Sequence, residues 1–169
     1  MGTTVVGLIA VEQLGAPYWL AFNIGDSRLY RLWDGDLSQI SVDHSYVQEL
    51  INSGRLSSDD ARAHPERNVV TRALGQGEDI EPDFWMMPPE PGERFLLCSD
   101  GLSGDVERAR IRDVLLAAED PADAAADLVA AALSAGGRDN ITVVVVDVRG
   151  VDGDGELETT RPRGPMLGG

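Results

Sequence analysis

The sequence predicts an α+β protein in which an antiparallel β-sandwich is flanked by helices. Two observations carry this prediction. Runs rich in β-branched and aromatic residues fill the first third of the chain, and helical patterns come mostly later. Strands and helices rarely alternate as parallel βαβ units require, so antiparallel sheets covered by helices are expected. At 169 residues with 43% hydrophobic residues, the chain is long enough for one domain with its own core.

Four strands are expected in the first third of the chain, forming an antiparallel meander: 3–12, 18–24, 28–33 and 36–42. The stretch from Leu14 to Pro17 has turn chemistry, and Asp34-Gly35 is a typical two-residue hairpin turn. Helical spacing then predicts a helix over 44–52 with a stop at Gly54, and a short helix that ends before Pro65.

The second half should contain two more strands, two helices and a final strand: 80–87, 94–98, 106–117, 121–135 and 141–148. The final strand is apolar on both faces, which predicts a position inside the sandwich and away from its edges. After Gly150 the composition changes to glycine, proline and charged residues. We therefore expect a domain over 1–149 and a disordered acidic, glycine- and proline-rich tail over 150–169.

Composition excludes several classes of function. The net charge is −15, all 14 basic residues are arginine, and no basic stripe is available for a nucleic-acid backbone. No apolar run approaches the roughly 20 residues that span a bilayer, so no membrane partner is expected. A single cysteine rules out an internal disulfide and fits a reducing compartment, and residues 1–11 make a poor signal peptide. These features together predict a cytoplasmic protein.

Two short motifs each place an aspartate in glycine-rich backbone beside an apolar strand. Asp100 follows the strand 95–98, and Asp139 lies in Gly-Gly-Arg-Asp-Asn directly before the strand 141–146. A carboxylate at a strand end, where glycine lets the backbone approach closely, can serve as an oxygen ligand for a hard cation. Either aspartate alone would be read as a turn residue or helix N-cap, but together they predict a metal site.

In this order the motifs resemble those of the metal-dependent protein phosphatases of type 2C, the PPM family. The resemblance implies that Asp100 and Asp139 hold a pair of Mn²⁺ or Mg²⁺ ions, and that a metal-bound water is the nucleophile in place of a side chain. Residues 23–30 resemble a third family motif, which assigns Asp26 to an additional, weaker metal site, so that a complete member could bind three ions.

The resemblance also implies a mobile flap beside the site. Residues 43–45 and 63–75 resemble this segment, in which Asn68 falls where a polar residue can complete the shell of the third metal. His64 and Arg67 would lie on the substrate side of the flap. The expected partners are phosphorylated proteins.

The resemblance covers residues 1–148 and corresponds to the C-terminal two-thirds of the family. The family's phosphate-binding arginine, its Asn-Glu-Asp and its Asp-Gly-x-Gly-Gly motif do not occur, so the fold is expected to be incomplete at the N-terminus. The implied function is hydrolysis of phosphoserine and phosphothreonine in proteins, impaired in this chain. The alternative is a non-catalytic remnant that acts as a weak metal-binding or interaction module.

Other phosphate chemistries do not fit the spacing. A nucleophilic Cys98 would need an arginine six positions later, where Gly104 stands. Ser103 lacks the second glycine of a nucleophile elbow, and the absence of lysine excludes a P-loop.

Overall fold

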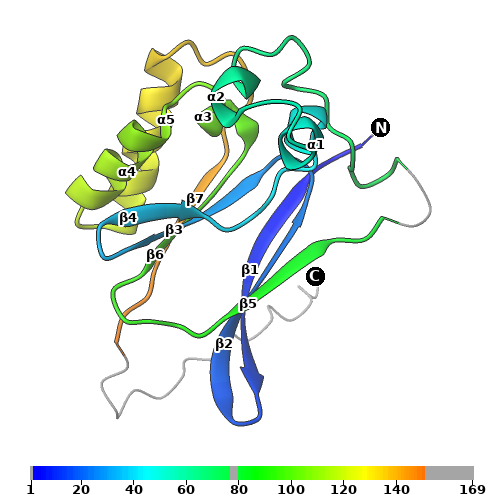
Figure 1. The fold of residues 1–169 in the computed structure, drawn as a ribbon. Helices are drawn as coiled ribbons and strands as arrows, with labels where there is room; N and C mark the ends of the chain where they lie inside the picture. The colour runs from blue at the N-terminus through cyan, green and yellow to red at the C-terminus, as the bar shows by residue number, and fades with distance from the viewer. Residues whose placement is uncertain (1, 77–79, 151–169) are drawn as a thin grey trace, which may run out of the picture.

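Two antiparallel sheets make up the body of the protein in the computed structural model, which describes residues 2–76 and 80–150. The first sheet has the order β1-β2-β5, from β1 (Val5–Gln13), β2 (Ala16–Ile24) and β5 (Asp83–Met87). The second has the order β4-β3-β6-β7, from β4 (Asp36–Gln39), β3 (Arg28–Trp33), β6 (Arg94–Cys98) and β7 (Val143–Asp147). The predicted antiparallel sandwich with helices is confirmed (Figure 1).

Five helices accompany the sheets in the described ranges: α1 (Tyr46–Asn52), α2 (Ser58–Ala61), α3 (Asp100–Ser103), α4 (Arg108–Ala117) and α5 (Pro121–Ser134). Four of them lie where the sequence predicts, whereas the single turn α3 was missed because its residues read as a glycine-rich loop. Ser45 and Ser57 cap α1 and α2 by accepting backbone N–H groups, as serine at an N-cap commonly does. None of the described helices has the length and apolar character to cross a bilayer.

The hairpin turns follow the predicted chemistry. Asp34 and Gly35 have φ values of 49° and 75°, and Leu14 and Gly15 have values of 55° and 79°. Positive φ at both central residues matches the right-handed twist of the flanking strands and keeps each hairpin in register.

The main core lies between the four-stranded sheet and the helices. Alternate residues of β6, Leu96 and Cys98, point toward α4 and α5, where they meet Ile111, Leu115 and Leu128. The opposite face of β6 points into the space between the two sheets. That second core is small, with Ala21, Leu29 and Phe95 as its only fully buried members among the described residues.

The predicted meander over the first four strands is wrong, because the chain changes sheets after β2. β1 and β2 pair in one sheet, whereas β3 and β4 pair in the other. The crossing is made by Gly25-Asp26-Ser27, and Gly25 has a φ of 108°. Alternating polarity indicates strands and turns but does not indicate which sheet a strand joins.

The prediction for the last strand is also wrong. β7 is an edge strand of its sheet, paired on one side with β6, although its residues are apolar on both faces. Val144 is 49% exposed. An apolar run on both faces is typical of a central strand. β7 is therefore unusually apolar for an edge strand.

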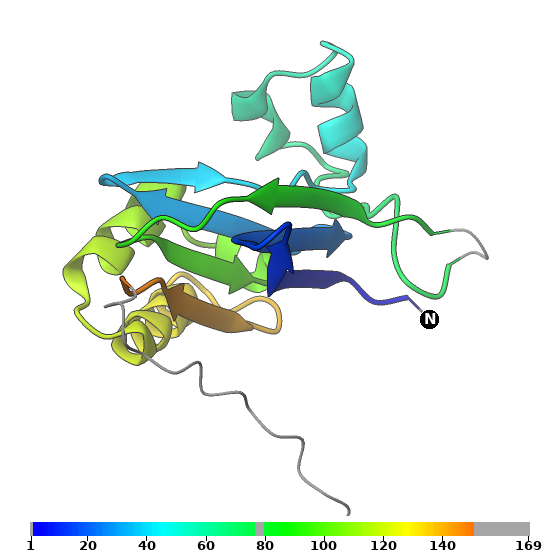
Figure 2. The same ribbon diagram turned by 90° about the horizontal axis from the view of Figure 1, so that it is seen from below.

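The segment 46–69, which carries α1 and α2, projects from the sheets at one end of the molecule (Figure 2). Its base is closed by backbone hydrogen bonds from Tyr46 N to Val69 O and from Thr71 N to His44 O. Between them, Leu50 and Ala61 are the only buried apolar side chains. This construction is consistent with the expected flap, whose mobility stays a prediction.

We expect the segment 46–69 to exchange its amide hydrogens faster than β6, because few buried contacts oppose its local opening. Hydrogen exchange followed by mass spectrometry at neutral pH measures both regions in one sample. The control region is α5, which packs against the main core and should be protected like β6. Protection of 46–69 equal to that of α5 would show that this segment is an integral part of the core.

Candidate metal centre

Antiparallel pairing brings the three predicted aspartates to one edge of the four-stranded sheet. Arg28 in β3 pairs with Cys98 in β6, and Cys98 pairs with Val143 in β7, so these residues form one row across the sheet. Asp26 stands two residues before this row, Asp100 two residues after it, and Asp139 four residues before it. Three segments far apart in the sequence therefore come together at one edge of the sheet.

The loops that carry Asp100 and Asp139 are joined directly. The Ser99 hydroxyl donates a hydrogen bond to Asn140 O (2.9 Å) and accepts one from Thr142 N (3.0 Å), while Ser99 N donates to Thr142 O. A Cβ at Gly101 would lie 2.4 Å from Asn140 O. Glycine is thus required at this position for the two loops to approach each other.

Arg138 provides a second link on the outer side of the site. Its Nε donates to Asp105 Oδ1 (3.0 Å), and its backbone N–H donates to the same carboxylate, which follows α3. These hydrogen bonds lower the pKa of Asp105. The link holds the residue before Asp139 against the segment after Asp100.

His44 holds the backbone of the Asp26 loop. Its Nδ1 accepts a hydrogen bond from Gly25 N (3.0 Å), and its Nε2 lies 3.1 Å from both Asp83 Oδ2 and Arg72 Nη1. Arg72 donates to the other oxygen of Asp83 (3.0 Å). A buried histidine thereby connects the crossing between the sheets to β5 and to the base of the projecting segment.

The site is electrostatically unfavourable to its own carboxylates. Burial, and then the charge of Asp100, raises the pKa of Asp26 from 3.8 to about 6. Burial, and then the charge of Asp139, raises the pKa of Asp100. Among the described residues no ion pair involves any of these three aspartates.

The cation whose charge acts on both Asp26 and Asp100 is Arg28, and it is already engaged. Its Nε and Nη2 donate to Asp43 at 2.6–3.0 Å, and its Nη1 donates to the Tyr30 hydroxyl at 3.1 Å. Its positive charge lowers the pKa of Asp26 and of Asp100, but by less than burial and like charge raise them. The edge of the sheet therefore keeps an excess of negative charge.

This donor set fits part of a divalent cation shell. Unpaired, partly buried carboxylates that repel one another are stabilised when a cation binds between them. Across the described ranges, however, no group of three or more His, Cys, Asp or Glu residues is close enough to hold a metal ion. The chain thus supplies neighbouring oxygen ligands without a complete protein cage.

The predicted flap residues Asn68, His64 and Arg67 form no hydrogen bond with the three aspartates among the described residues. Asn68 is exposed in the turn after His64, and no hydrogen bond connects its side chain with the described residues around Asp26. The His64 ring lies 6.2 Å from that of Tyr46, and its Nδ1 accepts from Glu66 N. Arg67 is exposed and close enough to Asp105 to lower its pKa. Their roles toward metal or substrate stay predictions.

Sequence reasoning missed His44, Arg28, Asp43 and Ser99 as residues that position the site. Each acts through a partner distant in sequence, and a lone histidine before a helix carries no signal of that contact. Cys98 is buried in β6 as expected, and burial raises the pKa of its thiol to about 12, which makes it a poor nucleophile.

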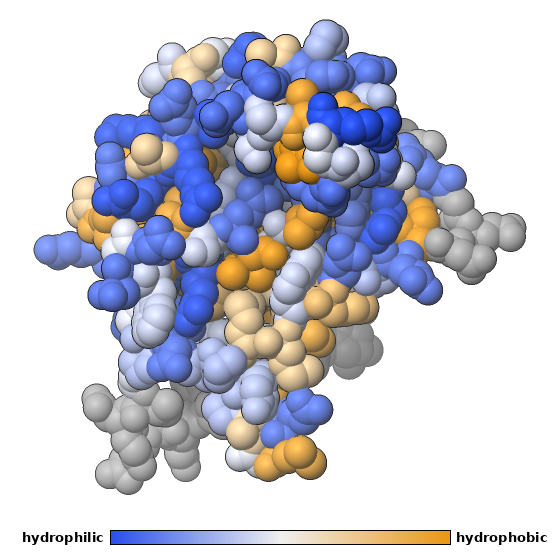
Figure 3. Space-filling view, viewed as in Figure 1, coloured by the Kyte–Doolittle hydropathy of each residue, from blue (hydrophilic) through white to orange (hydrophobic). Residues whose placement is uncertain are grey.

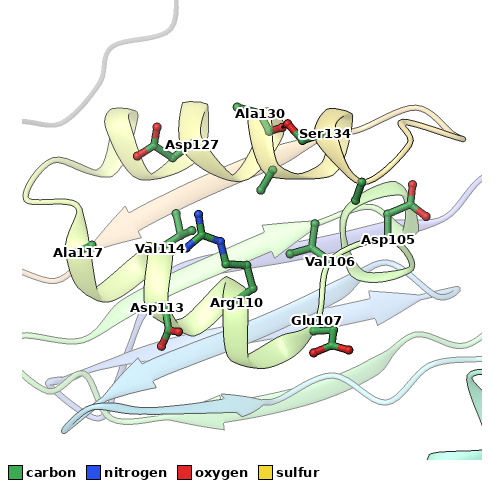
Figure 4. A pocket seen from close by; sticks show the side chains of 12 residues that line it. Asp105, Val106, Glu107, Arg110, Asp113, Val114, Ala117, Asp127, Ala130 and Ser134 are labelled. Carbon is green, nitrogen blue, oxygen red and sulfur yellow. The ribbon is translucent and has the colours of Figure 1, made fainter.

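A pocket with a volume of about 710 Å³ lies away from the aspartates, between α4 and α5. Asp105 borders one end of it, and Arg110 extends from α4 toward α5 above a floor that includes Val106 and Val114 (Figure 4). Asp26, Asp100 and Asp139 do not line it, so this groove is separate from the candidate metal centre.

Comparison with known proteins identifies relatives over most of the chain. The serine/threonine protein phosphatase PstP of Mycobacterium tuberculosis is 44% identical over 149 residues, which are 88% of this chain and 28% of PstP. The protein phosphatase PhpP of Streptococcus pneumoniae is 37% identical over 154 residues, 91% of this chain and 61% of PhpP. The chain thus spans less than two thirds of the length of these relatives. No model of a protein family matches the sequence.

Solved structures give the same result for the fold. The M. tuberculosis phosphatase PstP/Ppp superimposes with a TM-score of 0.80 at 40% identity, over 88% of this chain and 61% of that one. The PPM Ser-Thr phosphatase MsPP of Mycobacterium smegmatis gives 0.79 at 44% identity, over 87% and 62%. The PstP catalytic domain in complex with two manganese ions gives 0.77 at 39% identity, over 88% and 60%.

We expect Gly101→Ala to destabilise the protein by about 1–3 kcal/mol, the usual cost of forcing an extra methyl into a packed contact. In a helix, alanine is normally favoured over glycine by about 1 kcal/mol. Helix propensity alone would make Gly101→Ala stabilising, so a loss of stability would be caused by the close contact with Asn140. Urea unfolding measures the change, and Gly150→Ala is the control, because its Cβ would meet only an ordinary contact at 3.9 Å. Unchanged or increased stability of Gly101→Ala would contradict the close approach.

We expect Asp26→Asn to stabilise the metal-free protein at pH 7. The folded state binds the Asp26 proton more tightly than the unfolded state, so the charged form destabilises the fold above pH 6, and the cost disappears below pH 3.8. At about 1.4 kcal/mol per pKa unit, discounted for partial exposure, the gain should be about 1–2 kcal/mol.

Urea unfolding with a chelator at pH 7 and pH 4 checks this expectation. The gain should be present at pH 7 and nearly absent at pH 4. Asp113→Asn, at an exposed position on α4, is the control and should change stability little at either pH. A loss of stability in Asp26→Asn at pH 7 would mean that the carboxylate is already neutralised.

Proposed function

This chain belongs to the metal-dependent PPM, or type 2C, family of protein serine/threonine phosphatases, and from that membership we propose that it carries one side of a phosphoprotein phosphatase centre. The proposed reaction is hydrolysis of phosphoserine and phosphothreonine in proteins. The observation that carries it is the convergence of Asp26, Asp100 and Asp139 at one sheet edge without a cationic partner.

In this proposal Asp100 and Asp139 hold Mn²⁺ or Mg²⁺, and Asp26 contributes to an outer ion. One solved relative is a PstP catalytic domain with two manganese ions, which supports manganese as the cofactor. Divalent cations at such a site acidify bound water and offset charge on phosphoryl oxygens. The single cysteine, buried in β6, supports a reducing compartment such as the cytoplasm.

The chain's own residues have positioning roles. Ser99 and Gly101 set the spacing between the Asp100 and Asp139 loops, and His44 holds the crossing that carries Asp26. Arg28, fixed by Asp43, limits repulsion between the carboxylates without neutralising them. In this proposal Arg67, which is exposed on the projecting segment and lowers the pKa of Asp105, would meet the negative charge of a phosphorylated substrate.

One observation favours the alternative, a non-catalytic module that binds metal weakly or serves interaction. The described residues contain no group of three or more candidate ligands, so any ion held here depends strongly on water. With few carboxylates, less charge is available to offset the dehydration of a small cation.

We expect the 169-residue chain alone to bind Mn²⁺ weakly and to hydrolyse p-nitrophenyl phosphate near the background rate. Losing a single pre-organised stabilising group commonly costs about 3–4 kcal/mol in the transition state, and several are absent from this sequence. Calorimetric titration and a hydrolysis assay with Mn²⁺ measure the two properties on the same sample.

The test variant is Asp100→Asn/Asp139→Asn, which should abolish the Mn²⁺ isotherm. The matched control is Asp113→Asn/Asp127→Asn, at two exposed positions on α4 and α5, which removes the same charge elsewhere. Identical isotherms for wild type and test variant would contradict the metal assignment. Robust hydrolysis by the chain alone, abolished by Asp139→Asn, would show that the site is complete as it stands and would exclude the non-catalytic alternative.

A further inference from the structure

The groove between α4 and α5 has one wall of short side chains. Five residues of α5 and its C-cap line this wall: Asp127, Ala130, Ala131, Ser134 and Ala135. Their spacing of three and four positions places them on one face of the helix. Alanine and serine leave the helix backbone accessible, and helix axes approach to about 8 Å where the facing side chains are small. This wall therefore leaves room for a further helix.

The floor of the groove is apolar. Val106 and Val114 are each 6% exposed and form its base, next to Ala117 at the end of α4. The groove volume of about 710 Å³ lies within the range of about 300–1,000 Å³ that is usual for ligand pockets. The groove is thus large enough to hold several side chains of a partner.

The rim of the groove is acidic. Asp105, Glu107, Asp113 and Asp127 line it, against a single basic residue, Arg110. Of the four carboxylates, only that of Asp105 forms an ion pair among the described residues. Figure 3 shows hydrophilic side chains over α4 and α5, with patches of apolar surface between them. The groove therefore combines an apolar floor with uncompensated negative charge.

Arg110 shows which kind of side chain suits this environment. It extends from α4 toward α5, above Val106 and Val114 (Figure 4). Long cationic side chains commonly cover apolar surface with their methylene groups while the charged end stays near water. No ion pair holds Arg110 within residues 2–76 and 80–150, so a basic side chain of a partner can take its place.

We propose that this groove is the docking site for a basic amphipathic helix of a partner polypeptide. The apolar face of the partner helix would cover the floor of the groove. Its lysine or arginine side chains would pair with Glu107, Asp113 and Asp127 in place of Arg110. Binding of an amphipathic helix in an apolar groove is a common mode of peptide recognition. This inference goes beyond the proposed function and requires neither metal ions nor catalysis.

One end of the groove lies beside the candidate metal centre. Asp105 lines that end and accepts hydrogen bonds from Arg138, the residue directly before Asp139. A docked partner would therefore be held next to the predicted metal ligands, although none of these ligands lines the groove itself. Docking and metal binding can thus be measured separately.

Charge selects among the possible occupants. Each chain carries a net charge of −15, so a second copy would bring two strongly acidic proteins together. The chain's own Arg161 and Arg163 are basic, but four acidic residues precede them within 151–160. A separate polypeptide with an uninterrupted basic face matches the acidic rim better than either.

The probe is a synthetic, fluorescently labelled peptide of about 16 residues, with leucine on one helical face and arginine on both flanks of that face. A scrambled peptide of the same composition carries the same charge without an apolar face. Fluorescence anisotropy with the full 169-residue chain, in about 0.15 M salt and with a chelator, measures both affinities. We expect one-to-one binding of the amphipathic peptide, about tenfold tighter than that of the scrambled peptide, and slower amide exchange in α4 and α5.

The first test variant is Asp113→Asn/Asp127→Asn, which should weaken binding of the amphipathic peptide about tenfold. Its matched control is Glu12→Gln/Glu49→Gln, which removes the same charge at exposed positions on β1 and α1 and should leave binding unchanged. Circular dichroism of each variant shows whether it is folded.

The second test variant acts in the opposite direction. Arg110→Ala should tighten binding about threefold, because it uncovers the floor of the groove and removes a like charge. Its matched control is Arg112→Ala, which removes the same charge at an exposed position of α4 outside the groove and should have no effect.

Several results would overturn the inference. These are no saturable binding, equal affinity for the scrambled peptide, full affinity in a folded Asp113→Asn/Asp127→Asn variant, weaker binding by Arg110→Ala, or a dimer of the chain that the peptide dissociates. A gain in affinity for the peptide in Arg161→Gln/Arg163→Gln would identify the chain's own C-terminal residues as the occupant and would also contradict a separate partner.

The assay distinguishes this inference from the proposed function. Asp100→Asn/Asp139→Asn should lose the Mn²⁺ isotherm and still bind the amphipathic peptide with unchanged affinity. Peptide binding without a Mn²⁺ isotherm in the unmodified chain supports docking and contradicts the metal assignment, whereas a Mn²⁺ isotherm without peptide binding does the reverse.

Discussion

The pairing of β3, β6 and β7 is the constraint on which the candidate site depends. Because the row through Arg28, Cys98 and Val143 is set by backbone hydrogen bonds, the residues just beyond it must share one edge of the sheet. A slip of one residue in either ladder would exchange the side chains that β6 presents to the two cores, because successive residues of a strand point to opposite faces. The hydrophobic core and the placement of the aspartates are therefore specified by the same register.

Electrostatic repulsion at this edge of the sheet destabilises the folded protein. Asp26 and Asp100 are partly buried, repel each other and have no cationic partner among the described residues, while the guanidinium of Arg28 is committed to Asp43. A protein gains nothing from such an arrangement in the absence of a positively charged ligand. The positioning contacts of Ser99 and His44 hold the carboxylates where their own repulsion would separate them.

The two halves of the fold differ in completeness. The helix-covered side of the four-stranded sheet has a continuous core from β6 to α5, whereas the inter-sheet side has three fully buried residues in the described ranges and opens at Val144. The candidate site lies where these halves meet, at the crossing between the sheets. The loops that carry Asp100 and Asp139 are therefore held by the well-packed half of the fold. The loop that carries Asp26 depends on the open half.

The sequence by itself determined four of the five described helices, the hairpin turns and the position of each aspartate beside a strand, because glycine turns and apolar periodicity act over a few residues. The structure confirms the four predicted helices, the turn at Asp34-Gly35 and the strand β6, and motif order was enough to identify the family. Only the tertiary structure decided that the chain changes sheets at Asp26, that β7 is an edge and that His44 holds Gly25. Periodicity shows that a face is apolar, but which element covers it, or whether any does, depends on contacts between residues far apart in the chain.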